Sequence, residues 1–274
     1  MAVRKNQATL TATEKRNFVN ALLELKRTGV YDGFVRTHNQ FIMGDRDDSD
    51  RVGHRSPSFL PWHRQFLIQF EQELQKIDSS VTLPYWDWTV DRTATASIWG
   101  ADFLGGNGRS RDAQVTTGPF AYSTGKWNIT VSVDSRPYLQ RELGAGGVQL
   151  PTRAQVDTVL AMTTYDVAPW NSLSAGGFRN FLEGWRGEGN IHNRVHVWIG
   201  GQMSTGVSPN DPAFWLHHCF IDKLWADWQR MHPTSPYLPA AGTPNVVDLN
   251  DTMRPWNNVT PAAMLDHTAF YTYA

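Results

Sequence analysis

The sequence predicts a mainly α-helical fold, and three observations support this prediction. Apolar residues recur at three- and four-residue spacing in several long segments, as in helices with one buried face. Capping patterns stand at the start of two of these segments. Only one short stretch alternates between apolar and other residues as a strand would. The sequence shows no repeat and no linker, so we expect one domain over residues 1–274.

The N-terminal third contains two predicted helices and a loop. The first helix begins at TATE, where Thr11 can cap the helix and Glu14 can bond back to the cap. Gly29 is expected to end this helix. The next segment, YDGFVRTHNQFIM, places His38 on an apolar helical face. A polar, acidic loop follows at GDRDDSDRVG, and His54 stands just after it.

The rest of the chain alternates helices with long loops. The segment SPSFLPWHRQFLIQFEQELQKID predicts a helix from about Pro61, with His63 on its inner stripe. Residues 100–147 are rich in Gly, Ser, Thr and Asn, and we expect loops there with a short β-ribbon at NITVSV. Helical patterns return at PTRAQVDTVLAM, GGFRNFLEGW and NIHNRVHVWIGG. A last helix begins at NDPAFW, with Asp211 as N-cap and Pro212 at the first helical position. The tail after Pro233 reads as surface loop.

Charge and composition limit the classes of partner. The chain has 25 Lys and Arg against 26 Asp and Glu, a net charge of -1, and no long run of like charge. This balance argues against a nucleic-acid partner or a polybasic membrane surface and favours a small neutral ligand. No apolar run near the N-terminus is long enough for a signal peptide. A single cysteine excludes an internal disulfide, so the core, a metal or both must hold the fold.

Histidine placement points to a metal. Five histidines fall on apolar helical faces: His38, His63, His192, His196 and His218. His217 lies off the stripe that carries its neighbour, and we expect it to flank the site on the opposite side of the helix or at a pocket edge. A lone inward histidine is usually an ordinary core residue. Burying five imidazoles costs roughly 1–3 kcal/mol each unless their nitrogens find a partner. A metal ion would supply that partner.

The surrounding residues narrow the kind of metal site. HNRVH has the spacing of two ligands on one helix turn, but Asn193 stands where a zinc protease would carry its glutamate. The absence of a Glu-x-x-His pair counts against a di-iron carboxylate site. Cys219 is rotated away from the inward face, which argues against a blue-copper site. All-imidazole ligation remains, and it suits copper or zinc.

Five segments resemble a known family when they are taken together and in order. They are THNQFI, GHRSPSFLPWHRQFL, LPYWDW, HNRVHVWIGGQM and SPNDPAFWLHHCFIDKLWADW. The chain is similar over nearly its whole length to the type-3 copper polyphenol oxidases, in particular the actinobacterial tyrosinases. This resemblance implies a four-helix-bundle core that holds a dinuclear copper site. It implies three ligands for the first copper, His38, His54 and His63, and three for the second, His192, His196 and His218.

The resemblance also implies an activity. Proteins of this family use O2 to oxidise monophenols and o-diphenols to o-quinones, and we expect the same here. The alternative within the family is an o-aminophenol oxidase that forms o-quinone imines and acts weakly or not at all on monophenols. In tyrosinases, a Glu and an Asn hold a water that helps to deprotonate a monophenol, and Glu183 and Asn193 occupy the matching positions. Two further readings are an oxygen carrier, for whose shielding domain the chain leaves no room, and a zinc hydrolase.

Partners and supporting residues follow from the same resemblance. The actinobacterial tyrosinases rely on a small helper protein of the caddie type for copper loading and export, so we expect such a partner here. The chain would then be cytoplasmic or exported together with the helper. Asp222, one turn after His218, is expected either to support the site directly or through Arg55, or to form a surface ion pair. We expect LPYWDW to be core and Cys219 to form no thioether with a histidine.

Overall fold

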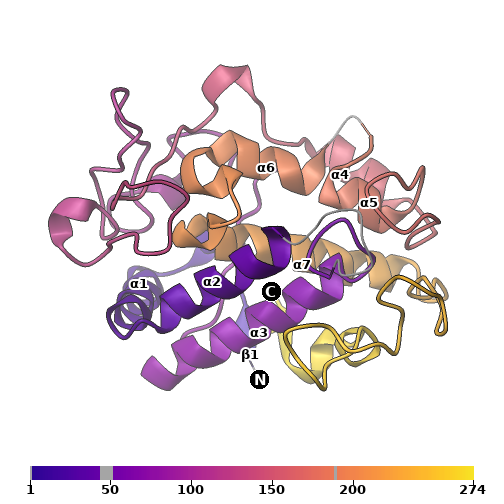
Figure 1. Ribbon diagram of the computed structural model, residues 1–274. Coiled ribbons are helices and arrows are strands. Elements are labelled where there is room, and N and C mark those ends of the chain that lie inside the picture. The colour runs from indigo at the N-terminus through magenta and orange to yellow at the C-terminus, as the bar shows by residue number, and fades with distance from the viewer. Residues whose placement is uncertain (1, 44–51, 188–189) are drawn as a thin grey trace.

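The computed structural model describes residues 2–43, 52–187 and 190–274, and these are mainly helical (Figure 1). The α-helices are α1 (Ala12–Arg27), α2 (Val30–Met43), α3 (Phe59–Ile77), α4 (Arg153–Leu160), α5 (Phe178–Glu183), α6 (Ile191–Ile199) and α7 (Ala213–Met231). Two short strands, β1 (Ala2–Arg4) and β2 (Tyr271–Tyr273), form the sheet. The predicted mainly α fold is confirmed.

Hydrogen bonds and backbone conformation confirm the predicted helix ends. Thr11 Oγ1 accepts a bond from the Glu14 amide at 3.2 Å, and Glu14 Oε2 accepts one from the Thr11 amide at 2.8 Å. Gly29, with φ of +78°, follows the end of α1. Asp211 Oδ1 accepts a bond from the Ala213 amide at 2.9 Å, which caps the start of α7. These caps depend only on neighbouring residues, and local sequence was therefore enough to predict them.

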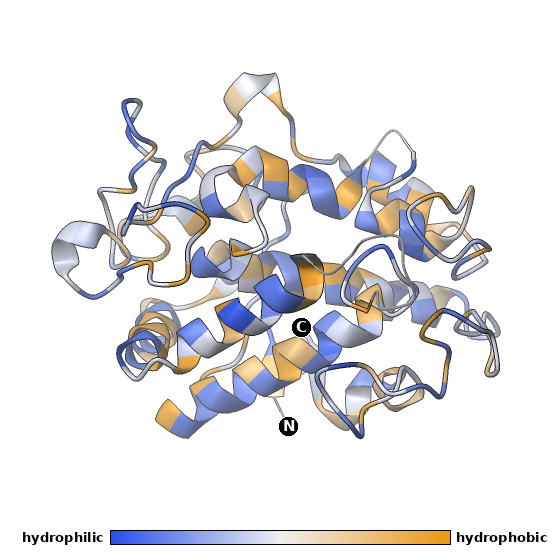
Figure 2. Cartoon of the chain, in the orientation of Figure 1, coloured by the Kyte–Doolittle hydropathy of each residue, from blue (hydrophilic) through white to orange (hydrophobic). Residues whose placement is uncertain are grey.

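Helix α7 is the central element of the core. It crosses the middle of the molecule in Figure 1, with α6 above it and α3 below. Helix α3 packs directly on α7, where the rings of Phe66 and Trp215 stack at 5.2 Å. Helix α2 reaches α7 through the rings of His38 and Phe214, which lie 4.8 Å apart. Figure 2 shows apolar and polar residues interleaved along these helices, as expected for elements that each bury one face.

The sheet lies elsewhere than predicted. Strands β1 and β2 pair in parallel, with Ala2 opposite Tyr271, and so join the two ends of the chain. The segment NITVSV does not form a strand, and the β-ribbon predicted there was wrong. The Ile129 amide bonds the Pro137 carbonyl at 2.9 Å, but the Val131 carbonyl accepts its bond from the side chain of Asn210 at 2.7 Å. A side chain thus supplies the bond that a ribbon would take from a second strand.

Buried charges tie α3 to α7. Arg64 Nε donates to Asp222 Oδ1 at 2.6 Å, and both side chains are almost fully buried. The hydroxyls of Tyr271 and Tyr273 also donate to Asp222. The expectation that Asp222 acts through Arg55 or pairs on the surface was therefore wrong, because its partner is Arg64. The pair links the residue after His63 to the turn after His218, and it fixes the relative position of the two helices.

The C-terminal tail is only partly surface loop. Met253 and Tyr271 are fully buried, and Met264 is nearly so. The Met264 carbonyl accepts a bond from Arg64 Nη1 at 2.7 Å. The tail therefore contributes to the core beside α3, a role that its irregular sequence did not indicate.

Candidate metal centre

Seven histidines gather in two groups in the interior. The first group consists of His38, His54 and His63, and the second of His192, His196, His217 and His218. Within each group the potential ligand nitrogens lie within 4.8 Å of one another. The groups face each other across α3 and α7, where the rings of His63 and His218 stack at 4.4 Å. The structure thus brings together all six predicted ligands, each triplet within one group.

The first group presents nitrogens that lack protein partners. His38 Nδ1 lies 2.9 Å from the Gly206 carbonyl, and His63 Nδ1 lies 2.9 Å from the Phe59 carbonyl. A carbonyl can only accept, so both Nδ1 atoms carry the proton and both Nε2 atoms present a lone pair. Each of these Nε2 atoms is buried without a hydrogen-bond partner, as is Nδ1 of His54. The Nε2 atoms of His38 and His63 are thus orphaned acceptors, which fit a metal ion.

In the second group, the Nε2 atoms of three histidines lie close together. His192 Nδ1 faces the Glu183 carbonyl at 3.2 Å, and His196 Nδ1 faces the Met203 carbonyl at 2.7 Å. Both Nε2 atoms therefore present lone pairs, yet they lie 3.0 Å apart. The Nε2 atom of His218 lies 3.3 and 3.2 Å from them. Two facing lone pairs cannot bond each other, and a cation between them would satisfy both.

Burial sets the charge state of these imidazoles. It lowers the pKa of His63 to about 3 and the pKa of His196 to about 4. Burial likewise lowers the pKa of the other histidines of both groups well below its usual value. Neutral imidazole is the form that binds metals, so both groups are ready to bind without releasing a proton. The donor set is purely nitrogen, which suits copper or zinc.

His217 is not the flanking residue that its helical phase indicated. It is fully buried, and its ring centroid lies 5.1, 5.0 and 5.1 Å from those of His192, His196 and His218. Trp88 Nε1 donates to His217 Nδ1 at 3.2 Å, so the proton of the neutral ring is on Nε2. That tautomer leaves no lone pair for a metal. Two features of the sequence could have indicated that His217 lies beside the second group: its position next to His218, and the aromatic segment LPYWDW, which supplies Trp88. That segment is core, as predicted.

Glu183 lies at the end of α5 behind the second group. Its Oε1 accepts a bond from the Arg55 amide at 2.6 Å, and its Oε2 accepts one from Arg179 Nη1 at 2.9 Å. Burial raises the pKa of Glu183, while Arg179 and the Arg55 amide oppose that rise. Asn193 Oδ1 lies 3.0 Å from His192 Nδ1. Both predicted polar residues therefore adjoin His192 of the second group, Glu183 through its backbone carbonyl and Asn193 through its side chain.

A pocket of about 730 Å³ opens over the two groups. His38, His54, His192 and His196 form part of its lining, which otherwise is largely apolar or neutral. A cavity of this size and character accommodates a small aromatic molecule beside the histidines.

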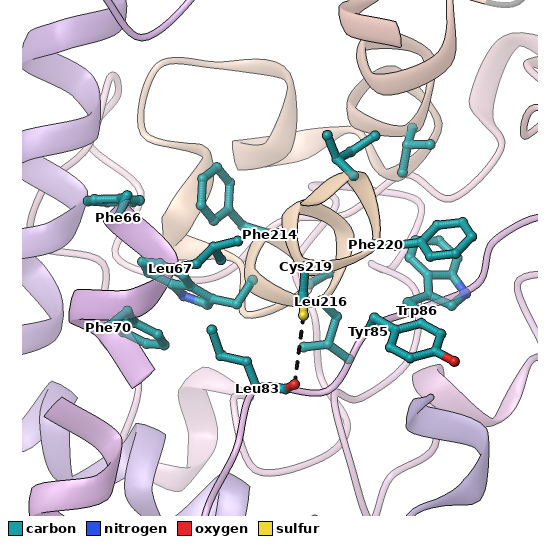
Figure 3. Close-up of a cluster of buried hydrophobic side chains, with 14 of the residues drawn as sticks. Phe66, Leu67, Phe70, Leu83, Tyr85, Trp86, Phe214, Leu216, Cys219 and Phe220 are labelled. Atoms are coloured by element: carbon teal, nitrogen blue, oxygen red, sulfur yellow. Dashed lines mark hydrogen bonds between the residues drawn. The ribbon is translucent and has the colours of Figure 1, made fainter. Parts of the chain in front are cut away.

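Cys219 faces away from both histidine groups, as predicted. Figure 3 shows its sulfur pointing into an apolar cluster that includes Leu67, Leu83 and Leu216. The thiol donates a weak bond to the Leu83 carbonyl at 3.7 Å. Burial raises the pKa of Cys219 to about 12, so it stays a neutral thiol. It behaves as a small apolar side chain in the packing of α7.

Known proteins share this arrangement of sequence and structure. The family model described as the common central domain of tyrosinase matches residues 28–231. The chain is 71% identical over 273 residues to a tyrosinase of Streptomyces antibioticus, covering 100% of this chain and 99% of that protein. The chain belongs to the tyrosinase family.

The chain is also similar to a second curated protein and to a solved structure. It is 48% identical over 302 residues to the grixazone synthase of Streptomyces griseus, with 99% of this chain and 98% of that protein covered. A polyphenol oxidase of Thermothelomyces thermophila superposes with a TM-score of 0.75 at 23% identity, covering 100% of this chain and 89% of the other. That likeness establishes a shared fold.

Membership of the tyrosinase family identifies the metal and the reaction. The chain is a dicopper oxidoreductase that uses O2 to oxidise phenols to o-quinones. The protein therefore uses copper, a metal that a nitrogen-only donor set suits. No helix in the described ranges is long and apolar enough to span a membrane.

Proposed function

We propose that each histidine triplet holds one copper ion. The first copper is assigned to His38, His54 and His63, and the second to His192, His196 and His218. The observation that carries this assignment is the set of three Nε2 atoms that lie 3.0–3.3 Å apart in the second group. The bound copper pair supplies O2 binding and accepts the electrons of the phenol. Residues 1–274 act as a single catalytic domain.

We further propose that Glu183 and Asn193 promote the reaction of monophenols. A carboxylate whose pKa is raised by burial is a better proton acceptor than an exposed one. Each oxygen of Glu183 accepts one bond and has a second lone pair for a water. Asn193 lines the pocket and can orient such a water toward a phenol hydroxyl. Glu183 would then receive the hydroxyl proton through that water.

A second candidate function is the oxidation of o-aminophenols. The similarity to a grixazone synthase over almost the full length of both chains favours this candidate. The two functions share the same histidines and differ in whether monophenols are hydroxylated. If o-aminophenols are the substrates, Glu183 and Asn193 contribute little to turnover.

A small helper protein that loads copper is the proposed partner. The pocket that leads to the histidines is rimmed by two exposed apolar side chains, Val133 and Val197, which are 60% and 52% exposed. Exposed apolar groups around a pocket are a feature of protein-binding surfaces. Copper content after expression with and without the helper tests its role, and full loading without it would contradict the proposal.

Copper content and O2 uptake on three substrate types test the main assignment. We expect two copper ions per chain and uptake with catechols. For a tyrosinase, Glu183→Gln should lower the ratio of monophenol to catechol turnover by about 100-fold, since one positioned proton acceptor is lost. A ratio that stays unchanged while o-aminophenols are the best substrates would favour the second candidate. Active protein without copper would overturn both.

A further inference from the structure

The pocket over the histidines carries one permanently charged side chain among its described lining residues. Arg55 is that residue, and it directly follows His54. The other described lining residues are histidines, polar neutral groups and apolar groups. We infer that Arg55 forms a carboxylate-binding site at the pocket rim, which makes the enzyme favour phenols that bear an anionic group on a ring substituent. The inference deepens the proposed function and rests on phenols binding in this pocket.

The backbone of Arg55 is held in place. Its φ is +51°, a left-handed conformation that a non-glycine residue adopts only when its surroundings impose it. Its amide donates to Glu183 Oε1 at 2.6 Å, which anchors the loop to α5. The left-handed backbone of Arg55 and the bond from its amide to Glu183 therefore fix the direction in which the side chain leaves the backbone.

The guanidinium group is oriented by stacking. Its central carbon lies 4.5 Å from the centroid of the Trp185 ring, which also lines the pocket. A stacked guanidinium uses its face for the ring and keeps its N–H edge for hydrogen bonds. Carboxylates match this edge because both oxygens can accept bonds side by side. Arg55 is partly exposed, so an incoming anion need not be fully desolvated.

The buried carboxylate nearby has a separate cationic partner. Glu183 bonds Arg55 through the backbone amide, and its other oxygen binds the guanidinium of Arg179 at 2.9 Å. Arg179 also pairs with Asp166 at 2.6 Å, and all three of these side chains are fully buried. None of these three side chains is among the described residues that line the pocket. Among the residues that the structure describes, the permanent charge that a substrate meets at the rim is therefore that of Arg55.

Three catechols of similar size test the inference. They are 3-(3,4-dihydroxyphenyl)propanoate, neutral 4-ethylcatechol and cationic dopamine. Catechols are chosen because their oxidation does not depend on the proposed role of Glu183. We expect kcat/KM in the wild type to favour the propanoate. In Arg55→Gln, the propanoate to ethylcatechol ratio should fall by about 10-fold and the dopamine to ethylcatechol ratio should rise, whereas Arg55→Lys should keep part of the preference.

Arg186→Gln is the matched control. Arg186 follows Trp185, is exposed and donates to the Leu173 carbonyl, but it does not line the pocket. Its substitution by Gln therefore removes the same charge at a position outside the pocket. We expect it to leave the substrate ratios as in the wild type. Equal shifts in both variants, or no shift in Arg55→Gln, would overturn the inference.

A binding measurement separates this inference from the proposed function. The affinities of 3-phenylpropanoate and 3-phenylpropanamide are compared in the wild type and Arg55→Gln by calorimetry. We expect the wild type to bind the carboxylate about 10-fold more tightly than the amide, and the variant to lose that difference. This result stands even if no catechol is oxidised, in which case only the proposed function fails. Equal binding of carboxylate and amide by the wild type would overturn the carboxylate site.

Discussion

The two histidine groups are built in different ways. His192 and His196 lie one turn apart on α6, and His218 completes their triplet from α7, so two helices supply the second set of proposed ligands. The first triplet draws on three separate elements, because His38 is on α2, His63 is on α3 and His54 is in the loop between them. Helical spacing alone places two ligands of the second group together. The first group depends on tertiary contacts to bring its loop ligand into position.

The groups also differ in what surrounds them. A fourth imidazole, His217, adjoins the second group and is held by Trp88, whereas no further imidazole belongs to the first group among the described residues. The contact between α3 and α7 sets the distance between the groups, through the stacked rings of His63 and His218 and the buried pair of Arg64 and Asp222. Substitutions at five residues test this comparison: His54, His196, Asp222, His217 and Cys219.

Removing one ligand from each group should have the largest effect. We expect His196→Ala and His54→Ala each to lower copper from two ions toward about one per chain and to reduce catechol oxidation at least ~100-fold, since both ions are needed. Elemental analysis and O2 uptake measure the two effects. Because His54 lies in a loop, its variant should keep the thermal midpoint of the copper-free wild type. Either variant retaining both ions and full activity would refute the assignment.

Breaking the link between the groups should cost stability. Asp222→Asn removes the charge that Arg64 faces in the core, and we expect the free energy of unfolding at pH 7 to fall by about 3–5 kcal/mol. Urea titration measures this loss. Asp227→Asn is the matched control, because Asp227 lies on the same helix in partly exposed pairs with Lys223 and Arg230 and should cost less than about 1 kcal/mol. Equal losses of unfolding free energy in the two variants would show that the buried pair contributes no more than an exposed one.

The stability that Asp222 contributes should depend on pH. Burial alone would raise the pKa of Asp222, but Arg64, Arg4 and two tyrosine hydroxyls outweigh it and hold the pKa below its usual value. A carboxyl with a lowered pKa stabilises the fold above its unfolded pKa of about 3.9 and loses that contribution as pH falls through the folded value. The difference between wild type and Asp222→Asn should therefore be full at pH 7 and shrink below about pH 4. If the difference in unfolding free energy between the two proteins stayed constant across this range, Asp222 would not be charged in the folded wild type.

Replacing the fourth imidazole should have a smaller effect. We expect His217→Phe to keep two copper ions, because the remaining triplet of the second group is intact. The Trp88 indole N–H would lose its acceptor, which should lower the free energy of unfolding by about 1–3 kcal/mol. Adding Trp88→Phe should recover part of this loss, since the unpaired donor is then absent. A fall to one copper ion would show that His217 is a ligand.

The smallest effect is expected at Cys219. Cys219→Ala should leave copper content and activity unchanged and lower the free energy of unfolding by about 1 kcal/mol, the cost of a small cavity in a tight core. In the folded wild type, a thiol with a pKa of about 12 should not react with a disulfide reagent at pH 8. Loss of a copper ion in this variant would contradict its placement outside both groups.

The sequence by itself determined the local features of this protein. The caps at Thr11 and Asp211, the helices between them and the inward phase of His38, His63 and His218 all follow from residues within one or two turns of each other. Helical phase is a property of the chain alone, and it holds wherever the helix is placed. The ordered motifs then supplied His54, which no periodicity could select from its loop.

The tertiary structure decided the features that depend on residues distant in sequence. Strand β1 pairs with β2 across nearly the whole chain, and Asp222 finds Arg64 from another helix, so neither partner could be read locally. His217 shows why phase was not enough. The turn of α7 around His217 is buried on all sides, since Leu216, His217, His218 and Cys219 are each almost inaccessible, and a turn without an outer face has no flanking position. Only the packing of α6 and Trp88 around α7 determined what each of its faces meets.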